Sequence, residues 1–221
     1  MTIGVEFGSR IVPVGPPASR RLGINDPAAT GDRAQEDESA LISDKDQKFM
    51  KLSLWDTAGQ ETYKSITRSY FRGASGALLV FDITRRSTFE SVTSWLNDLR
   101  QIADESIVVV LVGNKSDLAS SSLSSSGENQ RQVTKEEAET WCRQNKVLKY
   151  VETSAKSGDG VERAFIEVAE RIFQNIEAGK YDLNDRRSGV KSAASGGTGG
   201  GARAVNLTKN KAEAGKSSKC C

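Results

Sequence analysis

Residues 76–83 read GALLVFDI and residues 107–113 read IVVVLVG, and these two runs decide the fold. Both are short and almost entirely apolar, which is the pattern of parallel strands buried on both faces. The stretch between them, residues 87–103, repeats its apolar side chains at the spacing of one helix face. These side chains are Phe89, Val92, Trp95, Leu96, Leu99 and Ile102. A strand, a helix and a second strand in this order predict an α/β fold.

The alternation continues on both sides of this unit. Residues 49–55 and residues 149–152 each predict a strand. Thr134, with Glu137 three residues later, predicts the capped start of a helix. Residues 161–176 predict a last helix, whose inward side chains are Phe165, Val168, Ala169, Ile172 and Phe173. The sequence therefore predicts a mostly parallel sheet with helices on both faces.

Three stretches do not fit a compact domain. Residues 13–46 are polar and proline-containing, residues 119–132 are rich in serine, and residues 179–221 are rich in Gly, Ala and Lys. A structureless loop of about 30 residues is unusual inside a domain. We therefore predict a domain over residues 1–178, with insertions at 13–46 and 119–132. The first insertion is either protein or translated non-coding sequence. Residues 179–221 are predicted to form a disordered tail.

Charge and cysteine content add little about the whole chain but more about its end. The 221 residues carry a net charge of +2 and are 37% hydrophobic. From Lys180 to Cys221 there are nine basic and three acidic residues, a net +6. Such a tail is either a solvated arm or a segment that approaches an anionic membrane. Two of the three cysteines are the last two residues, so no disulfide framework is predicted and a reducing compartment is favoured. No membrane span and no signal peptide are recognisable.

The first chemical motif is DTAGQE at residues 56–61, directly after a predicted strand. An aspartate at the end of a strand can hold Mg²⁺, directly or through water. Gly59 has no side chain, so its N–H can approach a terminal phosphate, and Gln60 can orient an attacking water. The Asp-x-x-Gly pattern alone is also common in ordinary turns, but the intact WDTAGQE is much more specific.

Two further motifs each follow a predicted strand. The first is Asn114-Lys115-Ser116-Asp117, in which the Asp117 carboxylate matches the N1–H and N2–H₂ donors of guanine. A site built on such hydrogen bonds strongly rejects a base that lacks the donors. The second is residues 153–156 (TSAK), where the N–H of Ala155 can meet guanine O6. Each tetrapeptide alone could be a surface turn, but the three motifs in this order favour a guanine-nucleotide site at one rim of the sheet.

With these motifs in place, the chain resembles a Rab-type small GTPase of the Ras superfamily. The resemblance covers residues 2–12, 47–118 and 132–180, including TIGVEFGSR at 2–10 and SITRSYFRGASGALLVFDIT at 65–84. It implies a P-loop-NTPase-like small G domain that binds and hydrolyses GTP as a switch in vesicle traffic. It also implies Mg²⁺ bound with GTP or GDP as cofactor.

The resemblance also implies residue roles. The catalytic residue is Gln60, and Thr2 and Asp56 reach the metal, Asp56 through water. The aromatic residues that effectors read are Phe7, Trp55 and Tyr70, although aromatics in such places are also common in cores. Nucleotide contacts fall on Thr2, Asp56, Gly59, Asn114, Lys115, Asp117, Ser154, Ala155 and Lys156.

One expected part of the family pattern is missing. A small GTPase begins with a strand followed by GxxxxGK(S/T), and the sequence starts inside the region of Thr2 instead. The Gly215-Lys216-Ser217 tripeptide has the wrong residue, Asn210, five positions earlier and follows no strand. Without that loop we expect weak nucleotide binding, because its hydrogen bonds to phosphate contribute about 1.5–3 kcal/mol each. We also expect an open sheet, because the missing strand would lie between those that contain Leu54 and Leu79. The chain is thus predicted to be an N-terminally truncated form.

The chain ends in Cys220-Cys221, which the resemblance identifies as a double prenylation signal. Two lipid chains give stable anchoring where one gives only marginal binding. The implied partners are effector, exchange and activating proteins, the prenylation and membrane-extraction machinery, and the membrane, but no nucleic acid. The implied location is the cytoplasmic face of endosomal or Golgi membranes, in exchange with the cytosol. The alternatives are a nucleotide-free interaction module and a fragment that does not fold. Cys142, on the inner side of a predicted helix, is interpreted as a core residue.

Overall fold

The computed structural model describes residues 5–16, 47–59, 63–119, 130–183 and 189–191. Five strands, four α-helices and one short 3₁₀ helix are described within these ranges. In chain order they are β1 (Val5–Val14), β2 (Lys48–Thr57), α2 (Lys64–Phe71), β3 (Gly76–Asp82), α3 (Arg86–Arg100), β4 (Val108–Asn114), η3 (Ser116–Leu118), α4 (Lys135–Gln144), β5 (Lys149–Glu152) and α5 (Val161–Glu177). The predicted α/β fold is confirmed.

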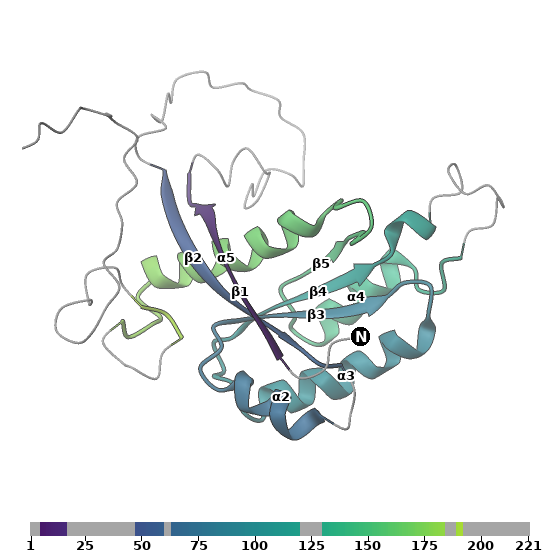
Figure 1. Ribbon diagram of the computed structural model, residues 1–221, viewed down its shortest axis with the longest axis horizontal. Coiled ribbons are helices and arrows are strands. Elements are labelled where there is room, and N and C mark those ends of the chain that lie inside the picture. Colours follow the sequence, from purple (N-terminus) through teal and green to yellow (C-terminus); the bar gives the residue numbers. More distant parts are fainter. Residues whose placement is uncertain (1–4, 17–46, 60–62, 120–129, 184–188, 192–221) are drawn as a thin grey trace, which may run out of the picture.

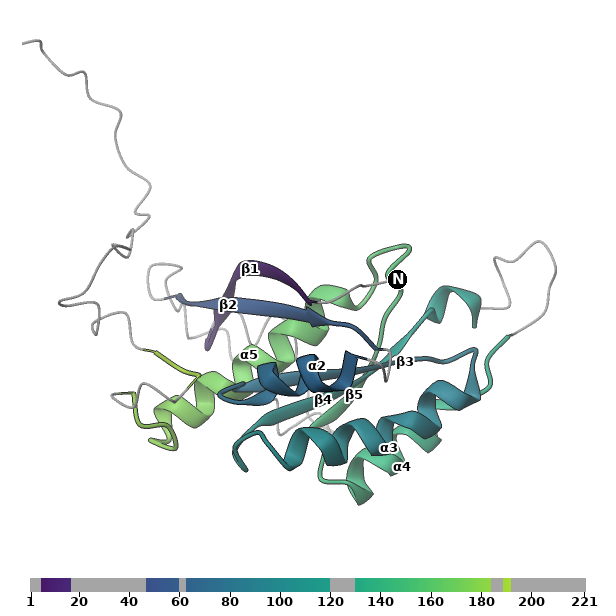
Figure 2. The same ribbon diagram turned by 60° about the horizontal axis from the view of Figure 1, so that its bottom comes forward.

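The centre of the molecule is a parallel sheet with the strand order β3-β4-β5. Helices α3 and α4 cover one face of this sheet and α5 covers the other (Figures 1 and 2). Side chains of β4 alternate between the two layers: Val109 and Leu111 pack with the α3 and α4 cluster, and Val108 and Val110 pack with α5. All of β4 from Val108 to Gly113 is buried, as the apolar run predicts.

The helices begin and end where local chemistry places them. The N-cap of α4 is Thr134, whose hydroxyl accepts a 3.2 Å hydrogen bond from the N–H of Glu137, so the predicted cap is confirmed. In α3 the predicted inward stripe is confirmed by the burial of Phe89, Val92, Leu96 and Leu99. Gly160 precedes α5 with φ +69°, and a Cβ there would lie 2.2 Å from the carbonyl oxygen of Glu152. A side chain at this position would therefore force the start of α5 away from β5.

Strands β1 and β2 form a separate antiparallel ribbon. Their inner side chains Val12 and Val14 pack on Ile166 and Ala169 of α5, which also packs under the three-stranded sheet. Among the described strands, none pairs with both β2 and β3. This is the place at which the resemblance puts an additional first strand.

The structure corrects the ends of three predicted irregular stretches. Pro13 and Val14, assigned to an insertion at 13–46, belong to β1, where Pro13 lies opposite Phe49. Proline is tolerated there because β1 pairs on only one side. At the end of the stretch at 119–132, the N–H of Gln132 donates to the Ile83 carbonyl at 2.9 Å.

The predicted tail at 179–221 also begins with ordered residues. Val190 is only 8% exposed and packs in the α5 cluster, together with the partly buried Tyr181 and Leu183. Within the described residues, no helix has both the length and the apolar character needed to cross a membrane.

Candidate functional site

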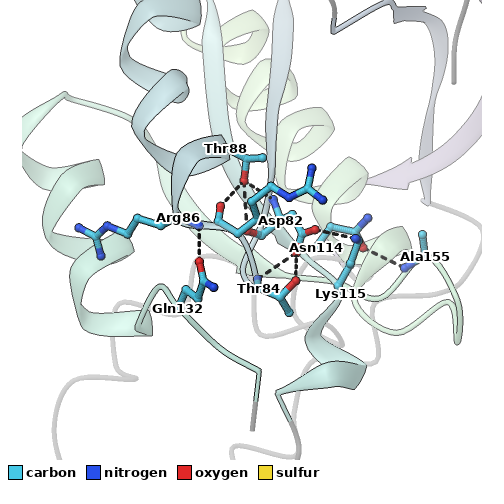
Figure 3. Close-up of polar contacts among 9 residues, drawn as sticks. Asp82, Thr84, Arg86, Thr88, Asn114, Lys115, Gln132 and Ala155 are labelled. Carbon is cyan, nitrogen blue, oxygen red and sulfur yellow. Dashed lines mark hydrogen bonds and ion pairs between the residues drawn. The ribbon is translucent and has the colours of Figure 1, made fainter.

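The carboxyl ends of β3, β4 and β5 meet at one rim, where polar residues follow the buried strands. The register pairs Asp82, the last residue of β3, with Asn114, the last residue of β4. The loop after β5 begins at Thr153 beside them, since its N–H donates to the carbonyl of Gly113 at 2.8 Å. In an open α/β sheet this rim is where ligands bind. Figure 3 shows the side chains that gather there.

Asn114 ties two of the predicted loops together. Its Oδ1 accepts a hydrogen bond from the N–H of Ala155 at 3.0 Å and lies 3.4 Å from Thr153 Oγ1. The N–H of Ser116 donates to the Thr153 carbonyl at 3.0 Å. Asn114 thus joins its own loop to the loop that follows β5 (Figure 3). In this geometry the Ala155 N–H that was predicted to meet guanine O6 is directed to Asn114 instead.

Asp117 faces the same loop. Its Oδ1 accepts a 2.7 Å hydrogen bond from the hydroxyl of Ser154, a residue that is completely buried. Ser154 is fixed in turn, because its N–H donates to the Asp159 carbonyl and its Oγ accepts from Ser157 N. Asp117 Oδ1 is thus held by a buried hydroxyl, which fixes the plane of the carboxylate. The ammonium-bearing Lys156 follows on the same loop and is exposed.

Lys115 lies between these residues in an unusual conformation. Its backbone is left-handed, with φ +71°, a region that non-glycine residues seldom occupy and that is common at functional sites. Its Nζ forms a 2.6 Å ion pair with Oδ2 of Asp82. The other oxygen of Asp82 accepts hydrogen bonds from the N–H and the hydroxyl of Thr84, at 2.9 and 2.6 Å. Burial alone would raise the pKa of Asp82, but the bonds from Lys115 and Thr84 outweigh it and lower that pKa below its ordinary value.

A second ion pair, between Arg131 and Glu152, involves the last residue of β5. Arg131 binds both carboxylate oxygens of Glu152, at 2.8 and 2.9 Å, and the hydroxyl of Tyr150 donates to Glu152 at 3.0 Å. Burial opposes ionisation of Glu152, but the bonds from Arg131 and Tyr150 prevail and lower its pKa. Burial is the main reason that the pKa of Tyr150 is raised. This cluster anchors the end of the serine-rich stretch to the last residue of β5.

The third motif lies on β2 and the turn that follows it. Asp56 stands in the ladder opposite Glu6, one residue before the strand ends, and is exposed. Strand β2 crosses β3 and β4 with the same left-to-right sense in both views (Figures 1 and 2). A Cβ at Gly59 would meet no atom within 4 Å, so the backbone there is open to approach. Thr2 and Gln60 lie outside the described residues.

The described oxygen donors fit a Mg²⁺ site only if phosphate oxygens complete the coordination of the ion. The described part of the chain contains no group of three or more metal-ligating His, Cys, Asp or Glu residues. Mg²⁺ usually keeps several waters and takes one or two carboxylates together with substrate phosphates. The carboxylate of Asp56 on β2 is consistent with that mode and not with an all-protein cage.

Phe7, Trp55 and Tyr70 form one continuous aromatic row, which we call the aromatic face. The ring centroids of Phe7 and Trp55 lie 4.8 Å apart and those of Trp55 and Tyr70 lie 5.1 Å apart. Phe7 is 61% exposed and Trp55 is 51% exposed. These rings come from β1, β2 and α2, so the row joins three elements at the surface. The grouping expected from the resemblance is present, while its role in effector binding stays a prediction.

The structure describes one of the three cysteines, Cys142. Cys142 is 4% exposed in the α3 and α4 cluster, and its burial raises the pKa of its thiol to about 11. It is therefore a packing residue with little thiolate character. Cys220 and Cys221 lie outside the described residues.

One residue of the rim, Asp82, was not predicted from the sequence. Its signal was available: it ends the run GALLVFD just as Asn114 ends VVVLVGN, so the two must meet in neighbouring parallel strands. Its single carboxylate belongs to no recognisable motif, so the sequence alone does not single it out as a site residue.

Comparison with protein families gives one match. The sequence model of the Ras family matches residues 27–174 of this chain. The match contains all three loop motifs, at residues 56–61, 114–117 and 153–156.

Proposed function

This chain belongs to the Ras family of small GTPases, and we propose that it is a Rab-type, membrane-anchored guanine-nucleotide switch in vesicle traffic. Membership in the family supports guanine-nucleotide binding and GTP hydrolysis in general. The observation that carries the proposal for this chain is the joining of Asn114 and Asp117 to Ser154 and Ala155 at one rim of the sheet.

In the proposed site, Asp117 recognises the guanine base. Its carboxylate accepts from the N1–H and N2–H₂ of guanine, a donor pair that adenine lacks, and the Ser154 hydroxyl keeps the carboxylate in the required plane. Lys115 lays its aliphatic stem along the base. The Ala155 N–H exchanges its bond to Asn114 for one to guanine O6 when the base enters. Discrimination against a base that lacks the matching donors is large in sites of this kind.

Hydrolysis and switching are assigned to the first motif. Gln60 orients a water whose oxygen attacks the terminal phosphorus of GTP, and GDP leaves with the bridging oxygen. Asp56, through water, and Thr2 would hold Mg²⁺, which would supply neutralisation of the charge on the phosphates. Gly59 and Thr2 contact the terminal phosphate, so their loops are ordered with GTP and released after hydrolysis. Effectors then read the ordered state at the aromatic face.

The anchoring part of the proposal rests on the end of the chain. Geranylgeranyl groups on Cys220 and Cys221, together with the basic tail, hold the protein on the cytoplasmic face of endosomal or Golgi membranes. Extraction by a lipid-binding partner returns it to the cytosol. Exchange and activating proteins set the nucleotide state.

The first test is nucleotide binding by the full chain. Titration with a fluorescent GDP analogue in the presence of Mg²⁺ should show saturable binding that unlabelled GDP reverses and ADP does not. Chelation of Mg²⁺ should speed release of the analogue. Equal competition by ADP and GDP, or no binding at all, would contradict the proposed function.

A second candidate is a partner-binding module that works without nucleotide. It is favoured by one observation, which is that no GxxxxGK(S/T) segment occurs in the 221 residues. This module would use the aromatic face, which is exposed and already assembled. If the titration shows no nucleotide binding while the chain melts cooperatively, this second candidate is the one supported.

A further inference from the structure

Asp82 is a charged rim residue that no motif accounts for, and several neighbours hold it in place. Its side chain is 15% exposed, while that of its partner Lys115 is 48% exposed. The carboxylate is therefore the enclosed, fixed member of the pair, and the lysine is the member that reaches into solvent.

The fixed position of Asp82 has several independent causes. Thr84 donates twice to its Oδ1, from the N–H and from the hydroxyl. The backbone N–H of Asp82 donates to Oγ1 of Thr88 at 3.0 Å, which ties it to the start of α3. Its β4 neighbour in the register is Asn114. Together these contacts hold the Asp82 carboxylate on a strand end, a turn and a helix (Figure 3).

Lys115 by contrast depends on Asp82 for its side-chain position. The left-handed backbone at Lys115 turns its side chain away from the path of β4, and its carbonyl accepts from Leu118 N to start η3. The 2.6 Å contact with Asp82 then fixes the far end of a side chain that would otherwise sample many rotamers. With both ends fixed, the four-carbon stem of Lys115 spans the rim between Asp82 and Asn114.

We propose that Asp82 is a positioning residue for guanine-nucleotide binding, which holds the stem of Lys115 in place as a preformed platform for the base. The proposal rests on the proposed function, since it concerns the same site. A side chain fixed before binding loses less conformational freedom when the base arrives, so the pair strengthens binding without touching the nucleotide. The platform acts through the flat face of the base and not through its edge, which sets it apart from Asp117.

The binding test compares D82N with a matched variant of another ion pair. E137Q removes the pairing of Glu137 with Arg86, whose side chains are 34% and 47% exposed, without touching Lys115. D82N should weaken binding of the fluorescent GDP analogue by roughly three- to tenfold, and E137Q should leave it unchanged. D82N should weaken binding of GDP and of IDP by the same factor, because IDP lacks only the N2 amino group, one of the two edge donors that Asp117 reads. D82E should recover most of the loss, because its carboxylate can still reach the ammonium.

Two further measurements separate positioning from a general loss of structure. In a K115M background, D82N should weaken binding no further, because a residue that acts through Lys115 has no effect without it. In the nucleotide-free chain, the carboxyl signal of Asp82 in an NMR titration should show a higher pKa in K115M than in the wild type.

The outcomes distinguish this inference from the function on which it rests. No nucleotide binding by the wild type overturns the proposed function and this assignment with it. Binding by the wild type with D82N equal to E137Q overturns the assignment alone. Full additivity of D82N and K115M, or an unchanged Asp82 pKa in K115M, would do the same.

Discussion

At the scale of single residues, the site is decided by a few side chains whose orientation is fixed by buried neighbours. Asp117 is the clearest case, because the hydroxyl of a fully buried serine donates to its Oδ1. A carboxylate held in this way presents two acceptors in a fixed plane. In the proposed function, these two acceptors meet two adjacent donors of the base.

The D117N substitution tests this reading. An amide in place of the carboxylate presents one donor and one acceptor, so it cannot accept from both donors of guanine but matches xanthine, which carries an oxygen at position 2. GDP affinity should fall roughly 100-fold or more, because two charge-assisted hydrogen bonds are disturbed, while XDP affinity should rise. Competition against a fluorescent GDP analogue measures both. D159N, on the loop after β5 that Asp117 faces, is the control, and a parallel loss of GDP and XDP binding would argue against base recognition by Asp117.

The aromatic face also depends on one residue, since Trp55 lies between Phe7 and Tyr70. Removing its ring should loosen α2 from the β1–β2 ribbon, because two ring contacts worth about 0.5–1.5 kcal/mol each are lost. W55A should therefore speed hydrogen exchange at amides of α2. F49A is the matched control. Phe49 is 65% exposed on the same strand and makes no ring contact with another aromatic among the described residues. Unchanged exchange in W55A would show that the row is not a structural link.

At the scale of elements, the sequence predicted those with strong periodicity and missed those held by tertiary contacts. The strands β3 and β4 were predicted because a strand buried on both faces is a continuous apolar run. Helix α3 was predicted because a helix buried on one face repeats its apolar residues at helical spacing. Helix α2 was not singled out, because only Thr67 in it is buried and Tyr63 provides no side-chain cap. The end of β1 was missed for another reason: Pro13 reads as a breaker, yet it is tolerated on a strand that pairs on one side.

The Arg131–Glu152 pair offers a test at this scale, because it fastens an irregular segment to β5. E152Q should lower the free energy of unfolding by about 1–2 kcal/mol at pH 7. The folded pKa of Glu152 lies below its ordinary value, so its contribution is present above that value and is lost as the pH falls through the folded pKa. The difference in the free energy of unfolding between wild type and E152Q should thus have its full size at pH 7 and become smaller below about pH 4. Urea unfolding at both pH values measures it.

The control for this pair is the exposed Lys135–Glu139 contact on α4, at 3.9 Å. E139Q should change stability by less than about 0.5 kcal/mol at either pH, since exposed pairs contribute little. A difference for E152Q that persists unchanged at low pH would mean that the ion pair is not its cause.

At the scale of the whole molecule, the described chain is two sheets held together by one helix. Helix α5 packs under β3 and β4 with Val168 and Ile172, and against β1 with Ile166 and Ala169. Of the inward side chains that the sequence predicted for α5, Val168, Ala169 and Ile172 are buried, while Phe165 and Phe173 are half-buried. The burial of Ile166 was not predicted, and neither was the contact of α5 with two sheets. Periodicity shows which residues are buried, and it does not show what buries them.

The segment after α5 completes this arrangement. Gly189 lies against the turn between α2 and β3, where a Cβ would come within 2.0 Å of the Gly73 carbonyl oxygen, and Val190 follows it into the α5 cluster. No sequence pattern marks these residues, because three residues in an otherwise polar and glycine-rich stretch carry no period. If their burial holds the molecule together, the boundary of the domain lies beyond Lys191 and not near residue 178.

V190A decides between these boundaries. Removing two buried methyl groups should lower the free energy of unfolding of the full chain by about 1–2 kcal/mol, because Val190 is 8% exposed. V80A is the matched control on β3, where the side chain is 58% exposed and the loss should stay within about 0.5 kcal/mol. Both are measured by urea unfolding, with the slope checked for an unchanged transition. Equal effects of the two substitutions would place Val190 outside the cooperative unit, since a residue that the fold does not bury on average cannot stabilise it more than an exposed one.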